Sequence, residues 1–290
     1  MVAERLNTRR SGSGEPLVLI HGIGSALTVW NRMLPALEAR HEVIGVDLPG
    51  FGESPMPDDG CSPASLAEAV ARELDALGVE RPHVVGNSLG GWVALELAAR
   101  ERAASVLAIS PAGLWSEREK WWVDSSLKST RRATKAVAPI ASTVMRSRAG
   151  RASLIQFAPR PWRCPPEVLA TAVTTSAGAR NFEATLEQML ANQPTDLGSI
   201  ACPVLIAWGT RDYLLFPRQG RRFERLIPGA ELRPLEGLGH APMLDAPDEC
   251  VELVLEFTRQ ASTGTRQAST GTTRHGKAAA GGAAEAPAKS

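Results

Sequence analysis

A serine flanked by glycines at a strand-to-helix junction most constrains how this chain can fold. Gly86-Asn87-Ser88-Leu89-Gly90 follows the apolar run 82–85 and precedes the apolar run 91–98. The first run predicts a short buried strand and the second a packed helix. A sharp turn between them leaves no room for side chains two residues either side of the serine, and both of those positions are glycine. Ser88 is therefore forced outward at the end of a strand, which makes it a candidate covalent nucleophile.

Strands and helices alternate through most of the chain. Apolar runs predict buried strands at residues 17–20, 43–46, 82–85, 105–109, 203–208 and 230–235. Residues 65–77 and 248–257 carry apolar side chains at helical spacing. Strands separated by helices imply parallel βαβ units. The sequence therefore predicts an α/β fold with a doubly wound, mostly parallel sheet.

One segment breaks this alternation and another ends it. Residues 113–201 are helical in character and contain Trp115, Trp121, Trp122 and Trp162. We expect them to form an inserted helical cap over the carboxyl edge of the sheet, where open α/β sheets place their ligand sites. The core is then residues 1–112 followed by residues 202–258. Residues 259–290 contain a repeated TRQASTG and an Ala/Gly-rich stretch, which predicts a disordered tail.

Composition excludes several classes of function. The formal net charge of the 290 residues is +1, so the overall electrostatic field of the protein does not favour binding of nucleic acid. No stretch approaches the roughly 20 apolar residues of a membrane span, and the N-terminus lacks a secretory apolar region. The 4 cysteines are scattered, with no metal-ligand spacing, which predicts reduced thiols in the cytoplasm and no metal site. The oligomeric state stays open.

A serine hydroxyl is a weak nucleophile near neutral pH and needs a general base. Of the 5 histidines, His41 and His83 begin strands, and His275 lies in the tail. His21 opens a glycine-rich turn after a strand, which favours an architectural role. His240 lies in a loop between the last predicted strand and the final helix. That position, at a strand's carboxyl end, makes His240 the candidate base.

The base needs an orienting carboxylate, and Asp212 follows the next-to-last strand directly. Ser88, Asp212 and His240 then occur in the chain order that a strand-turn-helix nucleophile of this kind uses. The strand at 105–109 is followed by no acid. Asp245 comes too soon after His240 to approach it from another strand end, and we expect it to cap the final helix.

Attack on an acyl carbon also needs donors for the negative oxygen that forms. Backbone N–H groups serve best because they are held in place before the reaction. Leu89 follows the nucleophile at a helix N-terminus and is the first candidate. The turn after the first long strand supplies the second, for which Ile23 is preferred and Gly24 is the alternative.

These motifs together resemble the α/β-hydrolase fold family. The resemblance covers roughly residues 12–258 and rests on HGIG at 21–24, DLPGFGES at 47–54, GNSLGG at 86–91, WGTRD at 208–212 and GHAPMLDAP at 239–247. It implies an eight-stranded, mostly parallel sheet with a helical cap. It also implies a triad of Ser88, His240 and Asp212, an oxyanion hole from Ile23 and Leu89, and neither a metal nor an organic cofactor.

The start of the chain departs from this pattern. Family members usually open with a β-hairpin, but only residues 4–9 precede the turn at residues 11–14. That length would leave the sheet without its first strand and the site unaffected.

Within this family, the type of nucleophile indicates which reaction an enzyme catalyses. Haloalkane dehalogenases and epoxide hydrolases use an aspartate where this chain has Ser88. The preferred interpretation is hydrolysis of a small-molecule carboxylic ester, or a related acyl bond, through an acyl-enzyme. Carbon–carbon bond hydrolases of ring-fission products have a sequence around the nucleophile, called the nucleophile elbow, that is similar to GNSLGGW. These enzymes, however, place a tryptophan after the catalytic histidine and an arginine in the cap. Here Ala241 follows His240, which disfavours that interpretation.

Two further interpretations stay open. Cofactor-free haloperoxidases, which act as perhydrolases, are barely separated from esterases by these motifs. A non-enzymatic ligand receptor or pseudo-hydrolase is disfavoured, because Ser88, Asp212 and His240 are all present.

The cap carries a strongly skewed charge. No acidic residue lies between Asp124 and Glu167, whereas nine basic residues do, namely Lys128, Arg131, Arg132, Lys135, Arg146, Arg148, Arg151, Arg160 and Arg163. They could attract a carboxylate-bearing substrate or an anionic surface, but a solvated helix face is the favoured interpretation. The tryptophans of the cap could line an apolar pocket or pack against the sheet.

Overall fold

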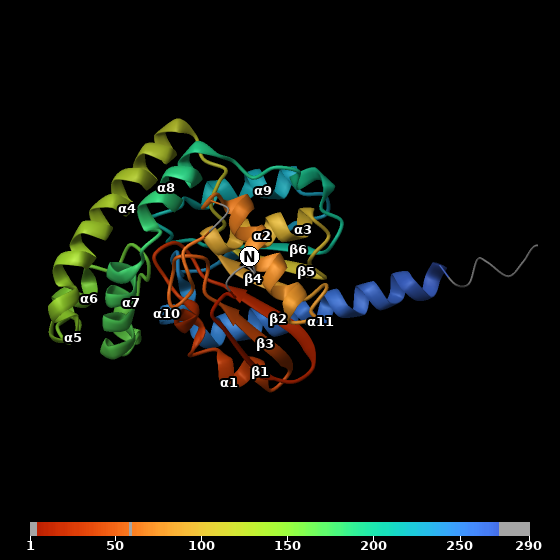
Figure 1. Ribbon diagram of the computed structural model, residues 1–290, viewed down its shortest axis with the longest axis horizontal. Helices are drawn as coiled ribbons and strands as arrows, with labels where there is room; N and C mark the ends of the chain where they lie inside the picture. The colour runs from red at the N-terminus through yellow and green to blue at the C-terminus, as the bar shows by residue number, and fades with distance from the viewer. Residues whose placement is uncertain (1–4, 58–59, 273–290) are drawn as a thin grey trace, which may run out of the picture.

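A single seven-stranded sheet organises the molecule (Figure 1). The computed structural model describes residues 5–57 and 60–272, with side chains described as far as residue 263. The strand order is β1-β3-β2-β4-β5-β6-β7. β1 runs antiparallel to β3, and the other pairings are parallel. The strands are β1 (Thr8–Gly12), β2 (Glu15–Ile20), β3 (His41–Val46), β4 (His83–Asn87), β5 (Ser105–Ile109), β6 (Val204–Gly209) and β7 (Glu231–Leu235).

The doubly wound, mostly parallel sheet predicted from the sequence is confirmed. All six predicted strands occur, and β1 is an additional, unpredicted edge strand. Its polar sequence, Thr8–Gly12, hides it from a search for apolar runs, because an edge strand can be held by backbone pairing alone. The described residues thus form seven strands, one fewer than the resemblance implied.

Helices cover both faces of the sheet. Alternate residues of each strand point to opposite faces, so Val18 and Ile20 belong to the hydrophobic cluster on one face, whereas Leu17 and Leu19 belong to the cluster on the other. The α-helices are α1 (Leu34–Glu38), α2 (Pro63–Ala76), α3 (Leu89–Ala99), α4 (Glu117–Val137), α5 (Ala141–Val144), α6 (Arg148–Ala152), α7 (Pro166–Gly178), α8 (Phe182–Ala191), α9 (Gly220–Leu226), α10 (Pro242–Asp245) and α11 (Pro247–Thr272). The short 3-10 helices are η1 (Leu27–Trp30), η2 (Ala138–Ile140), η3 (Pro161–Arg163), η4 (Leu197–Ser199) and η5 (Pro217–Gln219).

The helical cap enters between β5 and β6 and contains α4 to α8 (Figure 1). An ion-pair cluster fastens its first helix to the core. Glu119 in the first turn of α4 is 1% exposed and contacts Arg218 at 2.7 Å and Arg222 at 2.6 Å. Burial alone would raise the pKa of Glu119, but hydrogen bonds from Arg222 and Ser116 lower it to about 2. The ionised carboxylate therefore stabilises the folded position of the cap.

The end of the core differs from the sequence prediction. Disorder was expected from residue 259, but α11 continues to Thr272. Ala261 is buried, and the Ser262 hydroxyl donates to the Glu15 carboxylate at 2.6 Å. These contacts reach across the sequence to β2, so local composition could not reveal them. Residues 273–290 of the predicted tail lie outside the described residues. No helix in the part of the chain that the structure describes is long and apolar enough to cross a membrane.

Candidate active site

Ser88 occupies a strained turn between β4 and α3. Its backbone has φ 59° and ψ −117°, a conformation that L-residues rarely adopt. A Cβ added at Gly86 would lie 2.1 Å from the Gly90 carbonyl oxygen, and one added at Gly90 would lie 2.2 Å from the Ile20 oxygen. Both positions therefore require glycine, as the sequence analysis inferred. The Ser88 N–H donates to Ile109 O at 3.0 Å, which ties the turn to the neighbouring strand β5.

Asp212 and His240 meet beside this turn, at the carboxyl ends of β6 and β7. His240 Nδ1 lies 2.8 Å from Asp212 Oδ2, and both side chains are buried. The other carboxylate oxygen, Oδ1, accepts the N–H groups of Leu214 at 3.0 Å and Leu215 at 2.8 Å. An ionised carboxylate only accepts hydrogen bonds, so the proton of this pair lies on His240 Nδ1. Among the residues that the structure describes, His240 Nε2 makes no hydrogen bond, so in this tautomer it can accept one.

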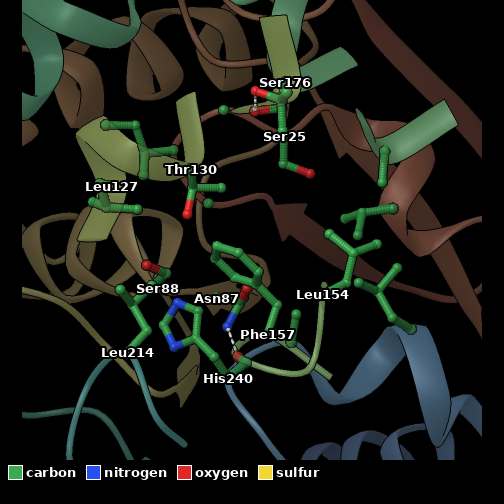
Figure 2. A pocket seen from close by; sticks show the side chains of 18 of the residues that line it. Ser25, Asn87, Ser88, Leu127, Thr130, Leu154, Phe157, Ser176, Leu214 and His240 are labelled. Carbon is green, nitrogen blue, oxygen red and sulfur yellow. Dashed lines mark hydrogen bonds between the residues drawn. The ribbon is translucent and has the colours of Figure 1, made fainter. Parts of the chain in front are cut away.

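Ser88 and His240 line the same cavity (Figure 2). Among the described residues the Ser88 hydroxyl makes no hydrogen bond to His240, an arrangement common in unliganded sites, where such contacts tighten when substrate binds. The main chain of His240 is held in place by Asn87. Its amide Nδ2 donates to His240 O at 2.9 Å and to Ile109 O at 3.1 Å, and Figure 2 shows the first of these bonds.

The two proposed oxyanion donors are the backbone N–H groups of Leu89 and Ile23. Leu89 is the first residue of α3, and Ile23 lines the cavity in the turn after β2. Within the described residues neither N–H donates to another protein group. Gly24 also lines the cavity, and its φ of 70° suits glycine. A Cβ at Gly24 would come within 2.9 Å of the Phe182 ring of the cap.

His21 fixes the turn that carries Ile23. The Leu48 N–H donates to His21 Nε2 at 3.0 Å, so that nitrogen is unprotonated. The proton is then on Nδ1, which donates to Gly22 O at 2.8 Å. Burial lowers the pKa of His21, and this keeps the ring neutral in that tautomer. The architectural role predicted for His21 agrees with these contacts.

The cavity is small and uncharged. It measures about 120 Å³, close to the roughly 150 Å³ of an engineered cavity that holds benzene. Helices α4, α7 and α8 and residues 154–157 of the cap form one wall, and the core forms the other. None of the residues that line it is an aspartate, glutamate, lysine or arginine. The lining residues are Gly22, Ile23, Gly24, Ser25, Val29, Asn87, Ser88, Leu127, Thr130, Thr134, Leu154, Phe157, Ala172, Val173, Ser176, Phe182, Leu214, His240, Ala241 and Leu244.

Comparison with known proteins identifies the family. The model of the alpha/beta hydrolase family matches residues 17–253. The chain belongs to this family. It is 30% identical to Lipase 1 of Psychrobacter immobilis, covering 83% of this chain and 75% of that protein. It is 33% identical to epoxide hydrolase EphH of Mycobacterium tuberculosis, covering 69% of this chain and 96% of that protein. A crystal structure of a membrane phospholipase A has a TM-score of 0.71 and 28% identity, covering 89% of this chain and 83% of that one.

Two features of the hydrolase were not predicted from its sequence. Asn87 holds His240, and the only signal for it is its place one residue before the nucleophile. Phe157 of the cap has its ring 6.3 Å from the His240 ring, and its carbonyl accepts the Ala241 N–H at 2.9 Å. No motif surrounds Phe157, so sequence patterns carry no signal for this contact.

The structure of the hydrolase also corrects one minor expectation and decides one open alternative. Asp245, expected to cap the final helix, instead accepts the N–H of Arg160 at 2.8 Å and joins the cap to the core. The four cap tryptophans divide between two environments, and none lines the cavity. Trp115 is buried against Trp92, with ring centroids 6.4 Å apart, whereas Trp121, Trp122 and Trp162 are exposed.

Proposed function

We propose that this hydrolase cleaves uncharged carboxylic esters with short acyl groups through an acyl-enzyme on Ser88. The hydrogen bond between His240 Nδ1 and Asp212 Oδ2 carries the proposal, because it leaves His240 Nε2 free to accept a proton in the cavity that Ser88 lines. The small, uncharged cavity supports the substrate class. The 4 unpaired thiols found among the described residues support a cytoplasmic location.

The reaction begins with attack of Ser88 Oγ on the acyl carbon. His240 Nε2 takes the hydroxyl proton, and Asp212 stabilises the imidazolium that results. Negative charge that develops on the carbonyl oxygen is received by the N–H groups of Ile23 and Leu89. The tetrahedral intermediate formed in this way then collapses, which breaks the ester bond, and His240 gives its proton to the departing alcohol.

The second half of the reaction releases the acid. Water replaces the alcohol, His240 Nε2 takes a proton from it, and the resulting hydroxide attacks the acyl carbon. When the intermediate collapses, the proton returns from His240 to Ser88 Oγ. The carboxylic acid leaves and the enzyme is restored.

The cavity disfavours the carbon–carbon bond cleavage that the elbow motif leaves open. That interpretation expects an arginine from the cap near the substrate, and no arginine lines the cavity. It also expects a tryptophan after the catalytic histidine, where this chain has Ala241. A carboxylate-bearing substrate would find no cationic partner in this cavity. The serine nucleophile likewise separates the chain from the aspartate-dependent epoxide hydrolases.

Hydrolysis of p-nitrophenyl esters from acetate to decanoate tests the proposal. We expect turnover to be greatest at acetate to butyrate and to fall for longer chains, because a cavity near 120 Å³ cannot enclose a decanoyl chain. Ser88→Ala should lower kcat by on the order of 10⁶ while the protein stays folded. Turnover by the variant close to that of the wild type would exclude Ser88 as the nucleophile. An optimum at decanoate would exclude the short-acyl preference.

A further inference from the structure

The distal end of the cap exposes several large apolar side chains. We define the cap tip as η2, α5, α6 and residues 153–163, which include η3. α5 packs against both η2 and α6, and α6 packs against η3, so these short segments form one surface. Figure 1 shows α5 and α6 at the end of α4 farthest from α9. On this surface Ile140, Ile155 and Trp162 are 56%, 44% and 54% exposed.

The same segments carry an excess of positive charge. Four of the acidic groups around it are already engaged: Asp124 pairs with Lys128, Glu183 pairs with Arg131 and Lys135, and Asp245 and Glu249 pair with Arg160. Glu167, at the start of α7, is exposed and makes no ion pair among the described residues. Four arginines at the cap tip have no ion pair among the described residues, namely Arg146, Arg148, Arg151 and Arg163. None of these arginines lines the cavity. Arg146, Arg148 and Arg163 are exposed, whereas Arg151 is half-buried, so most of this charge faces solvent.

We propose that the cap tip docks on an anionic lipid bilayer. Isolated isoleucine and tryptophan side chains among arginines match a lipid interface, where apolar groups enter the acyl boundary and cations meet the headgroups. Charge complementarity selects an anionic membrane, because each basic residue near such a surface raises binding by about fivefold. Docking is peripheral and needs no spanning helix.

Docking at this place would bring the membrane next to the cavity. Leu154 and Phe157 line the cavity, whereas Ile155 between them is exposed on the cap tip. One short segment thus separates the cavity from the docking surface. Insertion of Ile155 into lipid would move this segment and give a membrane-dissolved ester a short path to Ser88.

Sedimentation with vesicles tests the docking directly. Vesicles of phosphatidylcholine alone are compared with vesicles that contain about 30% phosphatidylglycerol. We expect the wild type to bind the anionic vesicles more tightly and to be released as salt rises from roughly 0.1 to 0.5 M. Arg146→Ala/Arg148→Ala should lower the partition coefficient on the order of 30-fold, because two basic contacts are lost.

Two further variants separate the apolar and electrostatic contributions. Trp162→Ala should weaken binding to anionic vesicles while the salt dependence stays. Arg221→Ala/Arg225→Ala is the matched control, because it removes two exposed arginines from α9, away from the cap tip. Its binding should equal that of the wild type. Thermal unfolding of each variant verifies that it is folded.

The proposal is overturned if the wild type binds neutral and anionic vesicles equally, or if it binds neither. It is also overturned if the control variant loses as much binding as Arg146→Ala/Arg148→Ala, since general positive charge would then explain the result. Ser88→Ala should bind vesicles as the wild type does. Failure of the esterase proposal is therefore distinguishable from failure of the docking proposal.

Discussion

Replacing Asp212 by asparagine should disable His240 without disturbing the fold. Asp212 Oδ1 accepts two backbone N–H groups, from Leu214 and Leu215, so the amide oxygen of the introduced asparagine must take that position. The amide NH₂ then faces His240 Nδ1, 2.8 Å from the present Oδ2. Since an NH₂ group only donates, Nδ1 must accept, and the histidine proton moves to Nε2. A protonated Nε2 in the neutral ring cannot take the proton of Ser88.

The expected loss of kcat for Asp212→Asn is on the order of 10⁴, which corresponds to about 5 kcal/mol in the activation barrier. KM should stay close to that of the wild type, because Asp212 does not line the cavity. The assay is steady-state hydrolysis of p-nitrophenyl butyrate, with thermal unfolding to verify the fold. Asp245→Asn is the matched control, a second buried aspartate outside the cavity, and its kcat should stay within about tenfold of the wild type. A kcat for Asp212→Asn above a tenth of the wild-type value would refute the tautomer argument.

Two further predictions concern the cap. Glu119→Gln should destabilise the protein at pH 7 by on the order of 3 kcal/mol, the equivalent of lowering the Glu119 pKa from 4.5 to about 2. Because the folded-state pKa is lowered, this stabilisation is present above pH 4.5 and is lost as pH falls toward 2. The free energy of unfolding measured with urea should therefore differ less between the variant and the wild type at low pH than at pH 7. An equal difference at low pH and at pH 7 would contradict the ion-pair account. Leu127→Ala removes a side chain that lines the cavity, so the ester-series optimum should move toward longer acyl chains. An unchanged optimum would place the acyl group elsewhere.

Much of the candidate site could be predicted because its parts are local motifs at the ends of strands. Ser88 is marked by glycines that the turn geometry requires, and Asp212 directly follows a recognisable strand. His240 was singled out by its place in a loop before the final helix. The structure brings Asp212 and His240 into hydrogen-bond contact and places Ser88 on the same cavity as His240. Their catalytic roles stay a prediction.

The features that could not be predicted depend on contacts between distant parts of the chain. The bond from Asn87 to the carbonyl of His240 joins residues 153 positions apart. The size of the cavity depends on how the cap segments meet the core, which no periodicity in the sequence records. Helix α11 extends into a repeat of low complexity because Ala261 and Ser262 find partners on the core. Composition alone describes none of these partners.

Labelling with diethyl p-nitrophenyl phosphate tests the nucleophile most directly. Attack by Ser88 Oγ on phosphorus would release p-nitrophenolate and leave a stable diethylphosphoryl ester, because hydrolysis of this adduct is slow. We predict one equivalent of p-nitrophenolate per chain, loss of esterase activity in step with labelling, and the adduct on Ser88 by peptide mass spectrometry. Ser88→Ala should release none. An adduct on any other residue, or inactivation without label on Ser88, would contradict the account.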